Sequence, residues 1–367
     1  MTVLPDLHLS ASTSRVGRDD PPEHPLLELE RLRTYFVQQD RTVRAVNGVS
    51  YRVQAGETLA VVGESGCGKS IHARSILRLL PRGGRIVSGA IRFNGVDLTK
   101  LDEREMRRVR GPQIGMIFQE PMNSLNPLLT IGRQLTEPLQ AHLGMSRRDA
   151  RLRAIDLLAK VRLPDPERHL REYPHQLSGG MCQRVMLAIA ISCDPVLLIA
   201  DEPTTALDVT VQAQILDLIS GLCSETGMAL ILITHDLGVV ARYADHVAVM
   251  YAGSIVEYAP TADLYSRPAH PYTRDLLRSL PKVGQRSQRL NSIAGSPPDL
   301  TIPWDGCAYA PRCSSATAEC STDVPPWFQV GPSHVSRCWR YMDAVGTPVA
   351  APAGGKVDER AGTEVRR

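Results

Sequence analysis

Eight consecutive residues combine glycines, a lysine and a serine where an apolar run gives way to a helical pattern. They are Gly63, Glu64, Ser65, Gly66, Cys67, Gly68, Lys69 and Ser70. A strand that leads through a glycine-rich turn into a helix directs several backbone N–H groups at one point, where the helix dipole also favours negative charge. Lys69 can reach the β and γ phosphates of a nucleotide, and the Ser70 hydroxyl can join the coordination sphere of Mg²⁺. The segment predicts a phosphate-binding P-loop, and the simpler alternative is a strand-to-helix turn with chance glycines.

Two carboxylates directly follow another apolar run. Val196–Ala200 has the length and composition of a buried parallel strand, and Asp201 and Glu202 come next. Sheets of parallel strands place their sites at the carboxyl ends of the strands. Asp201 suits a Mg²⁺ ligand through water, and Glu202 could orient or deprotonate an attacking water. The alternative is a helix start that carries acidic residues, since Pro203 and Thr204 follow.

Polar residues also stand at two other strand ends. Gln119 follows the apolar stretch 114–118, and His235 follows the stretch 229–234. From a strand end, Gln119 could touch a metal–nucleotide site and His235 could contact a γ phosphate. Taken alone, however, the glutamine is more typical of a solvated loop residue.

A second helix start has the features of an anion site. Ser178 stands where an N-cap would satisfy the first free N–H groups of the apolar helix 185–192, and Gly179 and Gly180 leave those groups exposed. The helical periodicity that surrounds this segment, from Asn123 to Asp194, predicts an inserted helical unit.

The region before the P-loop predicts antiparallel strands. Residues 27–32 and 49–53 alternate between apolar and polar, as half-exposed strands do. Between them lie Tyr35 and Phe36. An aromatic side chain ahead of a P-loop could stack on an adenine ring, but it could equally belong to the core.

Composition excludes several classes of protein. The chain has 367 residues, enough for two or three compact units, and its net charge of +3 is too balanced for wholesale nucleic-acid binding. No apolar run approaches membrane-spanning length, so a membrane role must be peripheral. Eight cysteines without a signal-peptide pattern suggest a reducing cytoplasm. Four of them are scattered and expected to be small buried hydrophobes: Cys67, Cys182, Cys193 and Cys223.

The other four cysteines lie close together in the proline-rich tail: Cys307, Cys313, Cys320 and Cys338. Four thiols in a short, loop-rich segment suggest a shared ligand, because such a segment has little core of its own. Thiolates suit an iron–sulfur cluster or zinc, and the absence of paired Cys-x2–4-Cys knuckles favours the cluster. Free thiols in a structured loop are the remaining alternative.

These motifs occur together and in the order of one known family. The chain from Leu26 to Ala259 resembles the ATPase subunit of ATP-binding cassette (ABC) transporters, through the P-loop, Gln119, Leu177–Gly180, Asp201–Glu202, Thr205–Asp208 and His235. The resemblance implies an α/β fold: a P-loop ATPase core at 26–259 with an antiparallel β subdomain and a helical insert at about 122–194. A small, loop-rich C-terminal extension is expected to follow at 260–343. A disordered arm at 1–25 is expected before the cassette, and a disordered tail at 344–367 after the extension.

The resemblance also implies roles for single residues. Ser178–Gly180 would be the signature motif, Gln119 the Q-loop and a Mg²⁺ contact, Asp208 the D-loop and His235 the switch histidine. Two cassettes are expected to face head to tail, so that the P-loop of one and the signature of the other enclose ATP. Phe36 matches the adenine-stacking position, which favours that role over the core. Two departures, the run Met181-Cys182-Gln183 and Thr205 in place of a commoner serine, remove no catalytic group.

Finer resemblance narrows the subfamily. Asn123–Pro127, Tyr173–His175 and His270–Thr273 are similar to oligopeptide and dipeptide importers, a subfamily that also imports nickel chelates and some oligosaccharides. This implies a second ABC ATPase subunit, with a heterodimer favoured over a homodimer, two permease subunits and an extracytoplasmic solute-binding protein. It also implies a place on the cytoplasmic face of the membrane and a [4Fe–4S] cluster on the tail cysteines, with Zn²⁺ as the alternative.

Two other function classes are disfavoured. A soluble cassette ATPase that acts on DNA or ribosomes would need a long coiled-coil insert or a second cassette in the chain. The sequence shows neither, so no nucleic-acid partner is expected. A GTPase would need an Asn-Lys-x-Asp base reader, and the similar stretch Asn94–Asp97 lacks the lysine.

Overall fold

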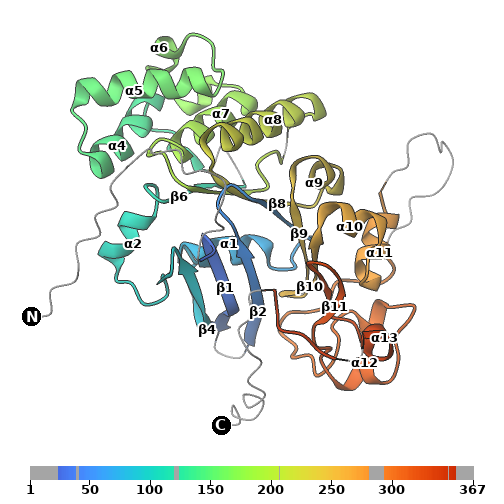
Figure 1. Cartoon of the computed structure of the whole chain (residues 1–367). Coiled ribbons are helices and arrows are strands. Elements are labelled where there is room, and N and C mark those ends of the chain that lie inside the picture. The colour runs from blue at the N-terminus through green and yellow to red at the C-terminus, as the bar shows by residue number, and fades with distance from the viewer. Residues whose placement is uncertain are drawn as a thin grey trace, which may run out of the picture.

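The computed structural model describes residues 24–38, 41–119, 124–205, 207–280, 293–345 and 347–352 (Figure 1). Most of the predicted arm and the end of the predicted tail lie outside these residues, as do the first residues of the predicted helical insert. Within the described part of the tail, Val349 forms a β-bridge with Trp327.

An antiparallel sheet precedes and flanks the P-loop, as predicted. Its strands lie in the order β2-β1-β4-β5, with the bounds β1 (Leu27–Gln38), β2 (Arg41–Val53), β4 (Gly84–Phe93) and β5 (Val96–Asp97). Leu27, Leu29 and Leu32 of β1 are completely buried, and an irregularity between Leu29 and Leu32 shifts the alternation by one residue. The apolar face of this sheet therefore forms part of the core, and its other face carries charges.

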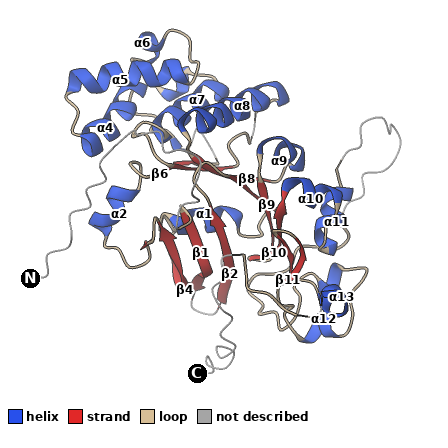
Figure 2. Ribbon diagram, in the orientation of Figure 1, coloured by secondary structure: helices blue, strands red, loops and turns tan. Residues whose placement is uncertain are grey.

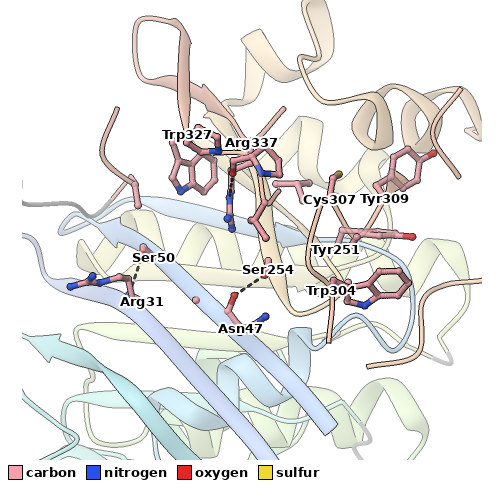
Figure 3. A pocket seen from close by; sticks show the side chains of 18 of the residues that line it. Arg31, Asn47, Ser50, Tyr251, Ser254, Trp304, Cys307, Tyr309, Trp327 and Arg337 are labelled. Atoms are coloured by element: carbon pink, nitrogen blue, oxygen red, sulfur yellow. Dashed lines mark hydrogen bonds between the residues drawn. The ribbon is translucent and has the colours of Figure 1, made fainter. Parts of the chain in front are cut away.

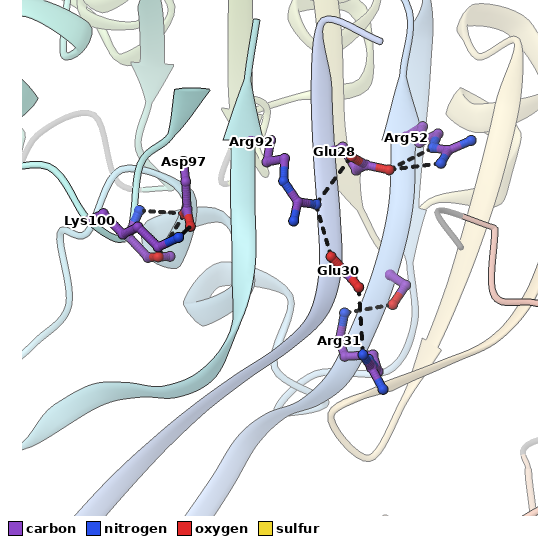
Figure 4. A network of polar contacts seen from close by, with 9 residues as sticks. Glu28, Glu30, Arg31, Arg52, Arg92, Asp97 and Lys100 are labelled. Atoms are coloured by element: carbon purple, nitrogen blue, oxygen red, sulfur yellow. Dashed lines mark hydrogen bonds and ion pairs between the residues drawn. The ribbon is translucent and has the colours of Figure 1, made fainter. Parts of the chain in front are cut away.

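Ion pairs cross the charged face of that sheet (Figure 4). Glu28 of the middle strand β1 accepts a hydrogen bond of 2.9 Å from Arg52 of β2 and lies 3.4 Å from Arg92 of β4. Arg92 also contacts Glu30 at 2.9 Å. Each such half-exposed pair contributes under about 1 kcal/mol to stability. Opposite charges directly across the strands favour this register over its neighbours.

The central sheet contains eight strands in the order β11-β12-β10-β9-β3-β8-β7-β6. Their bounds are β3 (Thr58–Val62), β6 (Ile114–Ile117), β7 (Leu197–Asp201), β8 (Ala229–Thr234), β9 (His246–Tyr251), β10 (Ser254–Pro260), β11 (Phe328–Gly331) and β12 (His334–Ser336). Strand β3 runs parallel to β8 and β9, and β7 runs parallel to β6 and β8. The apolar stretches 196–200 and 229–234 largely become β7 and β8, and every residue of both strands is buried. Val196, predicted as the first residue of the buried strand, precedes β7 and is exposed.

Helices cover both faces of the central sheet (Figure 2), and alternate side chains of the central strands belong to two separate cores. Ile199 and Ile231 pack with the antiparallel sheet and α1, whereas Leu198 and Leu230 pack with the helical unit. The helices on these faces are α1 (Lys69–Ile76), α2 (Glu103–Val109), α4 (Ile131–Leu143), α5 (Arg147–Lys160), α6 (Pro166–His169), α7 (Gly179–Ala190) and α8 (Val209–Thr226). None of the helices in the described segments is both long and apolar enough to cross a membrane.

The predicted helical insert is present. Its first spacing, Ile131, Leu135 and Leu139, is the buried stripe of α4. Its second spacing lies on α5, where Leu157 and Leu158 are buried. Both stripes face α7, so the insert is a small helical bundle placed over one face of the central sheet.

The C-terminal extension joins the central sheet. Strand β12 pairs antiparallel with β10, and β11 pairs with β12. The remaining helices of the described chain are α9 (Leu237–Tyr243), α10 (Thr261–Ser266), α11 (Pro271–Arg278), α12 (Glu319–Thr322) and α13 (Met342–Val345). One hydrophobic core contains residues of both the cassette and the extension, among them Tyr251 of β9, Tyr272 of α11 and Tyr309. The extension thus gains order from the cassette as well as from its own segments.

A buried carboxylate marks this seam. Glu257 of β10 is fully buried and accepts hydrogen bonds from the backbone N–H groups of Ala269 and His270, each at 2.7 Å. Its Oε1 also lies 2.8 Å from Nε2 of His334 on β12. A buried charge is tolerated where its hydrogen bonds are made, and here all three partners come from the extension.

Candidate functional site

The P-loop connects β3 to α1 through two glycines that no other residue could replace. A Cβ on Gly68 would lie 2.0 Å from the carbonyl oxygen of Ala45, and one on Gly63 would lie 2.1 Å from that of Met250. Gly68 also has φ of 105° and, as the N-cap of α1, offers no side chain to the first N–H groups of the helix. The loop is therefore pressed against β2 and β9, and the N-terminus of α1 stays open to an anion.

Lys69 reaches back over this loop. Its Nζ donates to the carbonyl oxygens of Gly63 at 2.7 Å and Glu64 at 3.0 Å, and the residue is buried. Cys67 is buried as well, and burial raises the pKa of its thiol, so this cysteine is a neutral core residue that contributes its backbone to the loop. An ammonium group held at the centre of a glycine loop can neutralise the charge of a bound phosphate.

Ser70 and Asp201 meet as expected for a metal–phosphate site. The Ser70 hydroxyl donates to Oδ1 of Asp201 at 3.0 Å. Asp201 is completely buried, and its Oδ2 has no hydrogen-bond partner among the described residues. Burial raises the pKa of this carboxyl group, while the Ser70 hydrogen bond opposes the shift. A buried carboxylate oxygen without a partner, beside a hydroxyl, fits the hard oxygen ligation of Mg²⁺.

Gln119, Glu202 and His235 converge at the carboxyl ends of β6, β7 and β8. Nε2 of Gln119 donates to Oε2 of Glu202 at 3.0 Å, and Nδ1 of His235 lies 3.5 Å from Oε1 of the same carboxylate. Sequence reasoning had not grouped these three around one carboxylate, and it placed Gln119 on the metal. In the structure, the Gln119 amide N–H donates to Glu202, and a contact of Gln119 with the metal stays a prediction.

Thr205 also belongs to this cluster, a role that the sequence analysis did not assign to it. Its hydroxyl donates to Oε2 of Glu202 at 3.1 Å. Glu202 itself has φ of 46°, a left-handed conformation that a side chain rarely adopts. Its backbone N–H donates to Ile233 at 3.0 Å, which continues the ladder to β8 beyond the end of β7. The carboxylate is thus held at a fixed position beside Asp201, with a side chain 11% exposed.

The segment Ser178–Gly180 begins α7 as predicted. Oγ of Ser178 accepts a hydrogen bond from the N–H of Met181 at 3.3 Å, which makes it the N-cap. A Cβ on Gly180 would approach Val211 of α8, whose N-cap is Asp208. Figure 1 places α7 and α8 on the far side of the central sheet from α1. Within one chain, the N-terminus of α7 and the P-loop therefore belong to different parts of the fold.

Phe36 lies near the end of β1, half-buried, opposite Val43 of β2 and Gly84 of β4. Its neighbour Tyr35 donates to Oδ1 of Asn47 at 2.9 Å. Phe36 thus has one side against its own sheet and the other partly open, so the adenine-stacking role stays a prediction.

The four tail cysteines line one small cavity, together with His270 and Tyr309. All are free thiols, and the backbone N–H of Cys307 donates to the carbonyl of Cys320 at 2.8 Å. Burial raises the pKa of Cys307 and Cys313, and raises that of Cys338 to about 11. No group of three or more His, Cys, Asp or Glu side chains in the described segments is already arranged to hold a metal ion. The donor set still fits a thiophilic group, since four thiols border the same space.

A larger cavity of about 700 Å³ lies between β1, β2 and the extension (Figure 3). Arg337 and Trp327 line one side, where the guanidinium lies 5.7 Å from the centre of the indole ring. Cys307 borders this cavity as well as the small one.

The comparisons with known proteins agree with this geometry. Residues 46–205 match the family model "ABC transporter". The chain is similar to the oligopeptide transport ATP-binding protein AppD of Bacillus subtilis (strain 168), with 49% identity over 319 residues, 87% of this chain and 97% of AppD. The chain belongs to the ABC transporter ATPase family.

Further matches support the finer resemblance. Residues 256–320 of this ABC ATPase match the family model "Oligopeptide/dipeptide transporter, C-terminal region". The dipeptide transport ATP-binding protein DppD of Bacillus subtilis (strain 168) is 48% identical over 315 residues, which cover 86% of this chain and 94% of DppD. A dimeric structure of the ATP-binding cassette MJ0796 in a post-hydrolysis state, bound to ADP and Pi, aligns with a TM-score of 0.58 and 28% identity over 64% of this chain and 98% of that one. The predicted family, fold class and ATPase activity are confirmed.

Proposed function

We propose that this ABC ATPase drives the import of di- or oligopeptides. The relatives above are named as oligopeptide and dipeptide transport proteins at 48–49% identity over most of both chains. The chain then works at the cytoplasmic face of the membrane, with a second ABC ATPase subunit, two permease subunits and an extracytoplasmic solute-binding protein. A different ATPase as the partner is favoured over a second copy of this chain.

The nucleotide site follows from the residues that meet at the P-loop. The backbone N–H groups of Ser65 to Ser70 cradle the phosphates, and Lys69 leaves the two loop carbonyls to pair with the β and γ phosphates. Asp201 and Ser70 would hold Mg²⁺, which would neutralise charge on the phosphates. Gln119 and His235 contact the γ phosphate end of the site, and Phe36 stacks on the adenine.

Glu202 is proposed to position and deprotonate the attacking water. The observation that carries this role is the convergence of Gln119, Thr205 and His235 on one carboxylate next to the Mg²⁺ site. Three contacts fix the direction of the carboxylate, and a fixed acceptor can align a water with the γ phosphate. The phosphoryl group then transfers to that water while Lys69 and the loop stabilise the departing diphosphate.

Replacing Glu202 by Gln tests this role, because the amide keeps the shape and loses the base. The variant should bind ATP as the parent does, and its hydrolysis rate in the assembled transporter should fall by about 10²-fold or more. Glu225→Gln, the same change at an exposed position of α8, is the matched control and should hydrolyse ATP normally. Hydrolysis by Glu202→Gln at the parent rate would refute the assignment.

A site shared between two subunits would give both the P-loop and Ser178–Gly180 a role in binding one nucleotide. In the proposed dimer, the N-terminus of α7 and Asp208 reach the P-loop of the partner subunit, and the partner's equivalent reaches this one. Ser178→Arg should therefore leave nucleotide binding at this chain's own P-loop intact while it disables the partner's site. Photolabelling of each subunit with a nucleotide analogue decides, and loss of labelling confined to this chain would contradict the shared site.

The four tail cysteines are proposed to ligate a [4Fe–4S] cluster with a structural role. Their support is the shared cavity of Cys307, Cys313, Cys320 and Cys338, and thiolate chemistry that suits iron. Protein purified without oxygen from iron-supplied cells should contain iron and sulfide and lose both in the double variant Cys313→Ser, Cys320→Ser. Stoichiometric zinc without iron would replace the cluster by a zinc site, and four freely titrating thiols in folded protein would end the proposal.

A further inference from the structure

The C-terminal extension contacts the P-loop at Glu64. Arg312 of the extension donates to both carboxylate oxygens of Glu64, from Nη1 to Oε2 at 2.7 Å and from Nη2 to Oε1 at 3.0 Å. The Arg312 side chain is only 6% exposed and that of Glu64 23%. A bidentate guanidinium–carboxylate pair in such a sheltered place fixes direction as well as distance.

Arg312 is itself held from several sides. Its Nε donates to the carbonyl of Ala294 at 2.9 Å, and its Nη1 lies 3.3 Å from the hydroxyl of Tyr251. The guanidinium carbon is 5.9 Å from the ring centres of both Tyr251 and Tyr309. Figure 3 shows these two tyrosines next to each other beside Cys307. Because the arginine has little freedom, the position of Glu64 follows that of the extension.

A second contact holds the backbone of the same residue. The N–H of Glu64 donates to the hydroxyl of Tyr272 on α11 at 2.9 Å. Tyr272 is completely buried, and its ring centre lies 4.6 Å from that of Tyr251 and 5.3 Å from that of Tyr309. Two separate segments of the extension therefore fasten the side chain and the main chain of one P-loop residue.

The fastened peptide group is one that binds the P-loop lysine. The Gly63–Glu64 peptide donates its N–H to Tyr272, and its carbonyl accepts from Nζ of Lys69 at 2.7 Å. The next carbonyl, that of Glu64, accepts from Lys69 at 3.0 Å and from the N–H of Cys67 at 3.3 Å. Rotation of this peptide would move both lysine acceptors and the turn that leads to Gly66. Its orientation is thus set by a residue outside the cassette core.

We propose that Arg312 and Tyr272 are positioning residues for nucleotide binding, which hold Glu64 so that the P-loop is preformed for the triphosphate. The proposal rests on the proposed ATP site and extends it to the C-terminal extension. A preformed loop loses less conformational freedom when it binds, so the contact should affect affinity more than turnover.

The test compares nucleotide affinity and turnover in full-length variants. Arg312→Gln and Tyr272→Phe should each raise the Kd of a fluorescent ATP analogue, and the KM for ATP of the assembled transporter, by about 5- to 10-fold, with kcat within about 2-fold of the parent. Arg312→Lys should recover part of the nucleotide affinity, because it keeps the positive charge. The recovery should be incomplete, because an ammonium group cannot make the bidentate contact of the guanidinium. The matched controls are Arg267→Gln, which breaks an extension ion pair with Asp263 at 2.8 Å, and Tyr341→Phe, which removes a hydroxyl bonded to Ala269 at 3.1 Å. Both should bind nucleotide as the parent does.

A double-mutant cycle shows whether Arg312 acts through Glu64. Glu64→Gln should raise the Kd by a similar factor, and adding Arg312→Gln to it should change the Kd by less than about 2-fold. Unchanged Kd in Arg312→Gln and Tyr272→Phe, or fully additive effects in the double variant, would overturn the proposal. Loss of folding in Arg312→Gln would leave Tyr272→Phe, which keeps the buried ring, to decide. Parent protein that fails to bind ATP, or binds it equally well after Lys69→Ala, would instead refute the proposed nucleotide site.

Discussion

Two buried histidines predict how the stability of this ABC ATPase depends on pH. His72 of α1 and His270, the N-cap of α11, are each about 1% exposed. Burial lowers the pKa of both to about 4, and for His270 nearby arginines oppose the influence of Glu257. In the unfolded chain a histidine has a pKa of about 6.5. Each imidazole therefore stays neutral in the fold at a pH where the unfolded chain binds a proton.

The direction and size of the effect follow from these values. Because the folded pKa lies below the unfolded one, the stabilisation is complete above about pH 6.5 and is lost as the pH falls towards 4. Between pH 8 and pH 5, each histidine should remove about 2 kcal/mol from the free energy of unfolding. His270 also loses a contact, since its Nδ1 accepts from the N–H of Tyr272 at 3.1 Å and cannot do so once protonated.

The assay is urea unfolding of the parent and of two variants at a series of pH values. His270→Asn keeps a side-chain acceptor at the N-cap of α11. His72→Gln keeps a hydrogen-bond partner for the Tyr51 hydroxyl, which lies 2.6 Å from Nε2 of His72. Between pH 8 and pH 5, the free energy of unfolding of each variant should fall by about 2 kcal/mol less than that of the parent. Other groups, such as His246, whose pKa Glu57 raises, act on parent and variant alike and cancel in the difference. Equal losses in parent and variants would refute the reasoning.

Three further predictions concern single residues of the site and the seam. Glu257→Ala should lower the free energy of unfolding by about 3–5 kcal/mol in urea unfolding, because it leaves His334 and two N–H groups buried without their acceptor; an effect below 1 kcal/mol would contradict this. Gly68→Ala should abolish nucleotide binding, because its Cβ would lie 2.0 Å from a carbonyl oxygen, whereas Gly66→Ala, with φ of 79° and no atom within 4 Å of the new Cβ, should weaken binding less. Asp201→Asn should raise the thermal midpoint, since burial disfavours the charged carboxylate, and at the same time abolish Mg²⁺-dependent hydrolysis; a lowered midpoint would show that the charge is already compensated.

Local patterns in the sequence were sufficient for most of the cassette. Residues 197–200 of β7 are all apolar, and Asp201 and Glu202 follow them. The burial of this strand and the place of Asp201 at its carboxyl end could therefore be predicted from the sequence pattern alone. Ser178 was predicted as an N-cap because serine before two glycines and an apolar run has a local hydrogen-bonding reason to be there. Both predictions could be made because the apolar pattern and the N-cap hydrogen bond involve residues that are neighbours in the sequence.

The contacts that were missed join residues far apart in the chain. Arg312 and Glu64 are separated by 248 positions, and nothing near either residue indicates the other. Tyr272 lay within a motif that identified the subfamily, but its hydroxyl has a role only once α11 packs against the P-loop. Strand β12 has three residues, too short for alternation to predict it, and it exists because β10 offers an unpaired edge. Tertiary packing determines such features, so the sequence showed their residues but not their partners.

The pairing of β10 with β12 also has a consequence for synthesis. A chain that emerges from the ribosome can assemble β3, β7, β8 and β9 before the extension exists, but Glu257 then stands on an open strand edge without its partners. An open edge can pair with any other extended chain, and in a crowded cell that leads to aggregation. The risk ends only when Val335 and Ser336 arrive opposite Tyr258 and Glu257. Ribosomes that pause within the extension would therefore leave the nascent cassette in its most vulnerable form, and a chaperone would have most to protect during that interval.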